Sequence, residues 1–104
     1  AKLHVFYWGD IDTHGLAILD RLRTYLPQTH SLMMDEPTLL AFKSLWGKEQ
    51  AQHAAEALAH LTETELQLYR ALREGVRRQV RLEQERIAWD WAWRCITETF
   101  AAMT

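Results

Sequence analysis

The chain opens with an apolar stretch, residues 3–8, in which hydrophobic side chains do not alternate with polar ones. Such a run is typical of a strand buried on both faces, as in a parallel sheet covered by helices, and disfavours an edge strand. After a polar turn, apolar positions recur at helical spacing: Gly15, Ile18, Leu19, Leu22, Tyr25 and Leu26. Polar side chains occupy the opposite face: Asp20, Arg21 and Arg23. We therefore predict a buried strand and then an amphipathic helix that stops before Pro27.

A second strand and helix are predicted next. Residues 31–34 form a short apolar run between polar segments, which is typical of a strand. Asp35 is placed to cap a helix that carries Pro37 in its first turn and continues to a break at Gly47. The order strand, helix, strand, helix favours right-handed crossovers and a parallel sheet. The predicted fold class is α/β, with a parallel sheet flanked by helices.

The middle of the chain has a less regular pattern. Residues 48–61, rich in Ala, Gln, His and Glu, favour a short helix. Thr62 and Glu65 have the spacing of a capping box, so a further helix is predicted to begin there and to end at Gly75. Residues 76–87 fit either a short edge strand or a charged helix.

The C-terminal segment again carries apolar residues at helical spacing: Trp89, Ala92, Trp93, Ile96, Phe100 and Met103. This stripe predicts a C-terminal helix in which Trp89 and Trp93 pack on the core. Trp91 lies off the stripe and is the candidate for a partner surface.

Composition restricts the class of protein. With 104 residues the chain makes one domain at most, and its net charge of −2 gives no general attraction to nucleic acid or anionic membranes. The single cysteine, Cys95, fits a reducing compartment, and no apolar run approaches the roughly 18 residues of a spanning helix, so we expect a cytoplasmic protein with no membrane contact. Because the chain lacks an initial Met and enters a strand at once, we expect a C-terminal piece of a longer protein.

The polar turn after the first strand holds the candidate chemistry. Asp10 and Asp12 lie two residues apart between Gly9 and Gly15, and extended geometry directs both carboxylates to one side. Two such carboxylates repel unless a cation lies between them, and oxygen ligands select Mg²⁺ or Mn²⁺. The alternative is that both acids only cap the following helix. The pairing and the glycines favour a site for a metal or for phosphate chemistry.

These residues resemble a known family. The string from Tyr7 to Leu16 resembles the acidic motif of the Toprim fold as found in the topoisomerase VI A subunit, although Thr13 stands where those relatives usually have Pro. The chain is more similar to the C-terminal Toprim domain of the nuclease subunit JetD of Wadjet plasmid-defence systems. That resemblance rests on the string Trp-Gly-Asp-Ile-Asp-Thr-His-Gly, residues 31–35, the helix start at Thr62 and residues 81–87, and it spans roughly the whole chain.

The resemblance implies Mg²⁺-dependent (or Mn²⁺-dependent) cleavage of DNA, with Asp10 and Asp12 as catalytic metal ligands and SMC-like subunits of the defence complex as partners. Residues 1–104 would be the C-terminal portion of a single Toprim-like domain, truncated on its N-terminal side. The third acid of the family, a Glu on an upstream strand, has no counterpart here, so this piece is expected to be inactive or nearly so alone. The sheet edge that truncation exposes predicts a homodimer or a swapped assembly.

Half of the twelve basic residues fall between positions 70 and 86: Arg70, Arg73, Arg77, Arg78, Arg81 and Arg86. They are candidates for contacts to the DNA backbone, with Arg77, Arg81 and His14 as the named contacts. Interleaved glutamates leave a solvated face of mixed charge equally open. Two of them, Glu83 and Glu85, belong to the string similar to the family and are candidates to lie near the acids.

Two other functions remain open. One is a non-catalytic α/β interaction module whose acids only cap a helix. The other is a phosphatase of the haloacid dehalogenase type, which also places Asp-x-Asp after a strand. That family has Thr or Val where this chain has His14, and it requires a downstream lysine and acidic pair that this sequence does not place.

Overall fold

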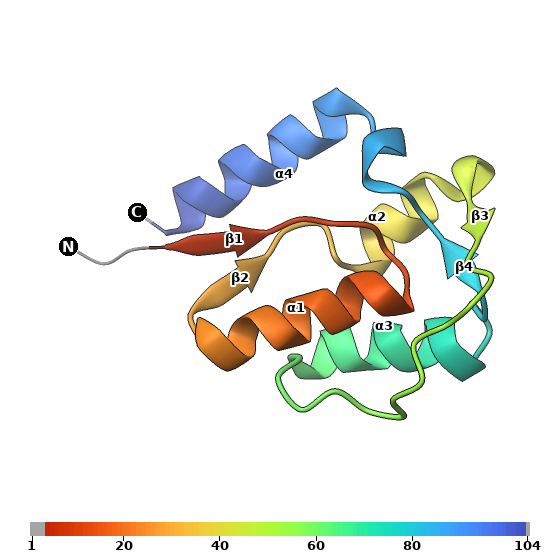
Figure 1. The fold of residues 1–104 in the computed structure, drawn as a ribbon. Coiled ribbons are helices and arrows are strands. Elements are labelled where there is room, and N and C mark those ends of the chain that lie inside the picture. Colours follow the sequence, from red (N-terminus) through yellow and green to blue (C-terminus); the bar gives the residue numbers. More distant parts are fainter. Residues whose placement is uncertain (1–3, 104) are drawn as a thin grey trace.

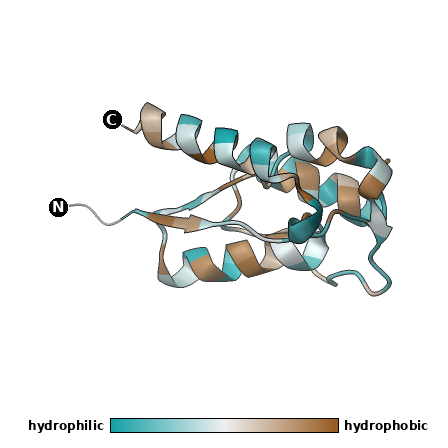
Figure 2. Ribbon diagram, turned by 90° about the horizontal axis from the view of Figure 1, so that it is seen from above, coloured by the Kyte–Doolittle hydropathy of each residue, from teal (hydrophilic) through white to brown (hydrophobic). Residues whose placement is uncertain are grey.

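The structure is a computed structural model that describes residues 4–103. Strands β1 (Val5–Tyr7) and β2 (Thr29–Ser31) lie between helix α1 (Thr13–Tyr25) on one side and helix α4 (Trp89–Ala102) on the other (Figures 1 and 2). Helix α3 (Glu63–Glu74) packs against α1. The predicted α/β class is therefore confirmed.

The first two strands pair in parallel, in the register Val5 with Thr29 and Tyr7 with Ser31. Among residues 4–103 this parallel sheet has only these two strands, so a larger Toprim-like sheet stays a prediction. Helices lie on both faces of β1, as expected, but its side chains are only partly buried. Within residues 4–103 β1 has one strand neighbour and is therefore an edge strand, which the apolar run did not predict.

The second strand begins and ends earlier than predicted. The Leu32 amide still donates a hydrogen bond of 2.8 Å to Tyr7 O of the neighbouring strand. The chain then leaves the sheet because Met33 has a φ of 58°, in the left-handed region that a strand does not use. The side chains of residues 32–34 are nevertheless buried in the core. Asp35 caps helix α2 (Glu36–Ala41) as predicted, since the Thr38 amide donates a hydrogen bond of 2.9 Å to Asp35 Oδ1.

Residues 48–61 do not form the predicted helix. Gly47–Lys48 is strand β3, which pairs antiparallel with β4 (Val80–Arg81), so the edge strand is the correct alternative for the later segment. Between β3 and α3 the backbone is irregular, and side chains of α3 donate hydrogen bonds to three of its carbonyl oxygens. Arg73 donates hydrogen bonds to two of them, and the Tyr69 hydroxyl donates one of 2.5 Å to Ala55.

Helix α3 starts at the predicted capping box. The Glu65 amide donates to Thr62 Oγ1 at 3.3 Å, and the Thr62 amide donates to Glu65 Oε1 at 2.8 Å. Gly75 follows the last turn as predicted.

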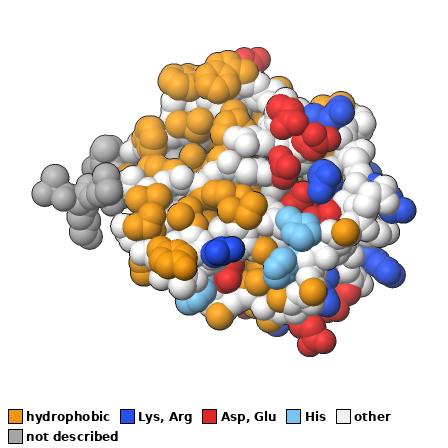
Figure 3. All heavy atoms as spheres, viewed as in Figure 1, with side chains coloured by type: hydrophobic (Ala, Val, Ile, Leu, Met, Phe, Trp, Pro, Cys, Tyr) orange, Lys and Arg blue, Asp and Glu red, His pale blue; other side chains and the backbone are white. Residues whose placement is uncertain are grey.

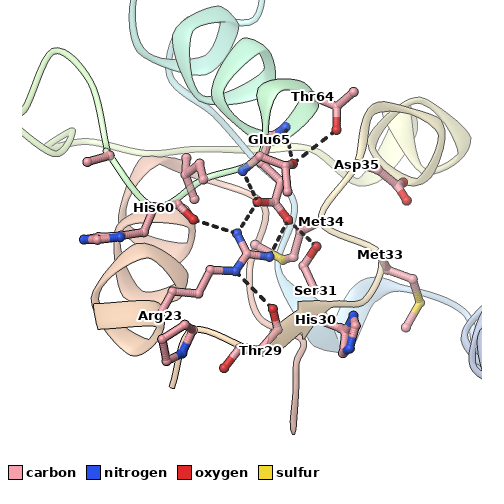
Figure 4. A pocket seen from close by; sticks show the side chains of 14 residues that line it. Arg23, Thr29, His30, Ser31, Met33, Met34, Asp35, His60, Thr64 and Glu65 are labelled. Carbon is pink, nitrogen blue, oxygen red and sulfur yellow. Dashed lines mark hydrogen bonds and ion pairs between the residues drawn. The ribbon is translucent and has the colours of Figure 1, made fainter. Parts of the chain in front are cut away.

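The buried face of α1 differs from the predicted one. Ile18 and Tyr25 are exposed, whereas Arg23, assigned to the polar face, is buried. The reason is a buried ion pair, in which the Arg23 guanidinium bonds to the Glu65 carboxylate and Arg23 Nε donates to Thr29 O at 3.1 Å. Figure 4 shows this pair in the wall of a pocket of about 600 Å³ between β2 and the start of α3.

The packing of α4 also corrects the prediction for its tryptophans. Trp89 and Trp93 are 65% and 56% exposed and stack on each other with ring centroids 6.0 Å apart. Trp91 instead packs against the core, and its Nε1 donates a hydrogen bond of 3.1 Å to Thr38 Oγ1. The helix meets the core through the stripe that includes Trp91, Ala92 and Ile96, which has helical spacing as well.

The core is formed by buried residues from all parts of the chain: Ile11, Leu16, Leu19, Leu39, Leu68, Tyr69, Leu72 and Leu82. Between residues 4 and 103 no helix is both long and apolar enough to cross a membrane.

Candidate active site at the start of α1

The acidic turn joins β1 to α1 and is held by a segment from the far end of the chain. Ile11 and Leu82 form an antiparallel bridge, with N–H to O distances of 2.8 and 3.0 Å between their backbones. Both side chains are fully buried. The bridge therefore fixes residues 81–84 against the turn that carries Asp10 and Asp12.

Asp12 is the N-cap of α1 and is only 2% exposed. Its Oδ1 accepts a hydrogen bond of 2.6 Å from the Gly15 amide, and its Oδ2 accepts one of 2.8 Å from Arg81 Nε. Burial raises the pKa of Asp12. The hydrogen bonds from Gly15 and Arg81 oppose that shift, whereas the negative charge of Glu49 adds to it.

Gly15 is required here by close approach. A Cβ on this residue would lie 1.9 Å from the backbone oxygen of Asp10 and 3.1 Å from Oδ1 of Asp12. No side chain fits without moving the turn. The glycine thus lets the acidic turn fold tightly onto the first turn of the helix.

Asp10 and Tyr7 lie beside the same turn. Asp10 Oδ1 accepts a hydrogen bond of 2.7 Å from the Gln84 amide, so Asp10 ties the turn to the segment after β4 and does not cap α1. The Tyr7 hydroxyl donates to Gly15 O at 2.9 Å. Burial, followed by the charges of Asp12 and Asp10, raises the pKa of Tyr7 to about 12, so Tyr7 stays neutral at physiological pH.

Glu49 is a third acid at this place, and the sequence reasoning missed it. Its fully buried carboxylate accepts hydrogen bonds from the Thr13 amide at 3.1 Å, the Thr13 hydroxyl at 2.6 Å and the His14 amide at 3.2 Å. Two carboxylates therefore cap the first turn of α1: Glu49 accepts from the first two backbone amides of the helix, and Asp12 accepts from the third. Glu49 falls in the segment predicted as a helix, and no spacing in the sequence relates it to Asp12.

The three candidate DNA contacts are used differently. Arg81 joins the acids, as described above. Arg77 places its guanidinium carbon 5.8 Å from the ring centroid of Trp46. His14 Nε2 is 2.7 Å from Ala51 O, within hydrogen-bond distance, and its ring meets that of His53 edge-on. Their role as DNA contacts stays a prediction.

Glu83 and Glu85 lie in the segment that borders the acidic turn. Glu83 forms an ion pair with Arg86 at 3.6 Å. The pKa of Glu85 lies below its usual value because the Glu85 carboxylate is hydrogen-bonded to the backbone amide of Glu85 and to the side chain of Glu83. Acidic side chains gather on this part of the surface in Figure 3, above the start of α1 and next to a basic group. The site is thus rich in negative charge.

The side chains around Asp10 and Asp12 are not arranged to bind a metal ion. Among residues 4–103, no group of three His, Cys, Asp or Glu side chains is placed to hold a metal ion. Both oxygens of Asp12 already accept hydrogen bonds, one of them from a guanidinium. The positive charge next to Asp12 is therefore that of Arg81, and the role of the two aspartates as metal ligands stays a prediction.

These features define a small α/β domain with a buried acidic turn at a strand–helix junction. Residues 1–96 match the family described as Wadjet protein JetD, C-terminal, and the chain belongs to that family. No curated protein matches the chain at a significant level. The family match confirms the resemblance to the JetD C-terminal domain and indicates a role in a Wadjet defence system. The relation to the Toprim fold and to the topoisomerase VI A subunit stays a prediction.

Proposed function

We propose that this chain is the Toprim-like part of a metal-dependent nuclease that cleaves DNA in Wadjet plasmid defence. The observation that carries the proposal is the position of Asp10 and Asp12, directly after strand β1, which is half of a parallel pair. Ligands of open α/β sheets bind at the carboxyl ends of parallel strands. Membership in the JetD C-terminal family supports the same assignment.

The proposal requires Mg²⁺ or Mn²⁺, which hard oxygen ligands such as these carboxylates prefer. Bound metal would supply Lewis-acid chemistry at the phosphate. Because Arg81 donates a hydrogen bond to Asp12 Oδ2, this oxygen could bind a metal ion only if that hydrogen bond were broken. The upstream Glu implied by the resemblance is expected to complete the ligand set, so we expect this piece to be inactive or nearly so alone.

DNA is the proposed substrate and SMC-like subunits of the defence complex are the proposed partners, in the cytoplasm. The expected homodimer is also kept as a proposal. The exposed Trp89 and Trp93 support it, because a stacked aromatic pair on a helix surface is typical of association sites. A monomeric mass measured by light scattering would refute the proposed homodimer.

The test uses the full-length parent protein and circular plasmid DNA with Mg²⁺ or Mn²⁺. We expect wild type to nick or linearise the plasmid, and Asp10→Asn and Asp12→Asn to lose this activity. Asp90→Asn is the matched control, because Asp90 is an exposed aspartate in the first turn of another helix. Cleavage that persists in Asp10→Asn, with folding confirmed by circular dichroism, would reject the proposal.

A non-catalytic interaction module is the second candidate. The observation in its favour is that Asp12 is fully used as a helix cap and as the partner of Arg81. A melting temperature of the parent that Mg²⁺ and Mn²⁺ leave unchanged would support this candidate, because a ligand that binds only the folded state raises the melting temperature.

A further inference from the structure

Basic side chains gather at the β3–β4 ladder. The ladder pairs Lys48 with Val80 and thereby brings residues 42–48 beside residues 76–82. These two segments contain no Asp or Glu. Figure 3 shows Lys and Arg side chains along the right-hand edge of the molecule, where β3 and β4 lie in Figure 1. The basic patch, as we call it, consists of four residues: Lys43, Lys48, Arg77 and Arg78.

No acid neutralises the basic patch. Among residues 4–103 the basic residues that form ion pairs all lie outside it: Arg23, Arg73, Arg81 and Arg86. Lys43, Lys48 and Arg78 are exposed. Glu49 follows Lys48 directly, but its carboxylate is fully buried and accepts hydrogen bonds from the first turn of α1. The patch is therefore a positive surface on a chain whose net charge is −2.

Trp46 positions two of the four cations. Lys43 Nζ and the guanidinium carbon of Arg77 each lie 5.8 Å from the centroid of the Trp46 ring. The indole is itself fixed, because its Nε1 donates a hydrogen bond of 2.8 Å to Leu39 O. Arg77 Nε is buried and has no hydrogen-bond partner among the described residues, so an aromatic ring and not an acid holds this guanidinium. Both charges are thus positioned without being neutralised.

Strand β4 connects the basic patch to the acidic turn. Arg77 and Arg78 precede this strand, and its last residue, Arg81, donates a hydrogen bond of 2.8 Å to Asp12 Oδ2. The next residue, Leu82, forms the antiparallel bridge with Ile11. The patch and the acidic turn are therefore neighbours on one rigid ladder.

We propose that the basic patch binds the phosphate backbone of duplex DNA, without sequence preference, and directs it to the acidic turn. This inference rests on the proposed function, because it takes DNA as the substrate. Contacts of Lys and Arg with phosphate release counterions and supply most of the affinity in non-specific DNA binding. Such contacts carry no sequence information. A chain without overall positive charge attracts DNA only through a local patch of this kind.

The test is fluorescence anisotropy with the full-length parent, a short labelled DNA duplex and EDTA, so that binding is measured apart from cleavage. Lys48→Gln with Arg78→Gln removes two exposed charges, so we expect several-fold weaker binding. A plot of log affinity against log salt should become shallower by about 2, since each phosphate contact contributes roughly 0.9 to the slope. Arg21→Gln with Arg94→Gln is the matched control, because it removes two exposed arginines of α1 and α4 that lie outside the patch, and should leave the slope unchanged.

The positioning role of Trp46 has its own test. Trp46→Leu keeps all four charges of the patch but no longer holds Lys43 and Arg77, so we expect it to weaken binding of the duplex. Trp46→Phe keeps an aromatic face and lacks the indole donor, so we expect it to retain most of the affinity. An equal loss in both variants, with folding confirmed by circular dichroism, would show that the hydrogen bond to Leu39 matters and would overturn this role.

The outcomes separate this inference from the proposed function. Unchanged affinity and slope in Lys48→Gln with Arg78→Gln, while Asp10→Asn abolishes plasmid cleavage, would overturn the patch and leave the proposed function standing. If the double variant binds more weakly but Asp10→Asn cleaves like wild type, the patch stands and the proposed function fails. A parent that binds duplex RNA but not duplex DNA would also overturn the patch. Lys43→Gln with Arg78→Gln is the second pair in case the first does not fold.

Discussion

The Arg23–Glu65 pair provides a quantitative test of what holds α1 to α3. Both side chains are buried, and the Glu65 carboxylate also accepts hydrogen bonds from Ser31 Oγ at 2.5 Å and from the Thr62 amide at 2.8 Å. Removing one partner of a buried pair leaves an uncompensated charge, which costs about 3–5 kcal/mol of unfolding free energy. We expect Arg23→Met to destabilise the chain by about that amount. This is a large part of the roughly 5–15 kcal/mol that stabilises a typical domain.

Urea unfolding followed by circular dichroism measures this free energy. The double variant Arg23→Met with Glu65→Gln should recover part of the loss, because it removes both charges while the glutamine side chain keeps an oxygen to accept from the Thr62 amide. Glu74→Gln is the control, since it breaks an exposed pair with Arg73 and is expected to change stability by less than about 1 kcal/mol. A loss below about 1 kcal/mol in Arg23→Met would refute the assignment of this pair as a buried ion pair that stabilises the fold.

The same pair predicts the response to acid. Burial by itself raises the pKa of Glu65, but the hydrogen bonds from Arg23, Ser31 and Thr62 outweigh it, and the net pKa lies below the usual value. The contribution of Glu65 to stability is therefore present above the unfolded pKa of roughly 4.3 and is lost as pH falls through the lower folded pKa. Glu65→Gln should flatten the stability curve in that acidic range. An unchanged curve would contradict the direction of this pKa shift.

Three further predictions concern the core and the acidic turn. Trp91→Ala should lower the free energy of unfolding by about 2–4 kcal/mol, because Trp91 packs on the core and donates a hydrogen bond to Thr38. Trp93→Ala, on the exposed face, should lower it by less than about 1 kcal/mol. Equal losses in urea unfolding would contradict the packing of α4. Gly15→Ala should destabilise the chain by about 3 kcal/mol or more, because its Cβ would meet a backbone oxygen at 1.9 Å, and a melting temperature equal to that of wild type would contradict the tight turn. In an absorbance titration at high pH, Tyr7 should ionise near its pKa of about 12, and Tyr7→Phe should remove the ionisation step at that pH. Because the folded pKa is raised, its contribution to stability is complete below the ordinary pKa of roughly 10 and is lost as pH rises through about 12.

Local patterns in the sequence predicted the ends of several elements. The capping box of Thr62 and Glu65, the cap at Asp35 and the stop before Pro27 all appear where expected. Each depends on hydrogen bonds or steric contacts within about four residues, so the residues that decide them are adjacent in the chain. The strand, acidic turn and helix around Asp12 were predictable for the same reason.

Which face of a helix is buried was less predictable. The buried face of α1 is rotated from the predicted apolar stripe toward Arg23, and that of α4 toward Trp91. Helix propensity decides neither rotation. On α1 the choice depends on Arg23, whose partner Glu65 lies 42 residues away. On α4 it depends on Trp91, which bonds to Thr38 at a separation of 53 residues. On α4 the face with Trp91 is buried, although the opposite face carries two tryptophans, because Trp91 finds a hydrogen-bond partner in Thr38.

The sequence by itself determined that two aspartates follow a strand and precede a helix, and the string around them identified the family. Only the tertiary structure decided what surrounds Asp12. Glu49 meets the first turn of α1 from 36 residues away, and Arg81 reaches Asp12 across 69. Such contacts follow no local period, because they exist only after the β3–β4 ladder and the Ile11–Leu82 bridge bring distant segments together. The chemistry of the acidic turn is therefore local in origin, whereas its charge balance depends on the packing of the whole domain.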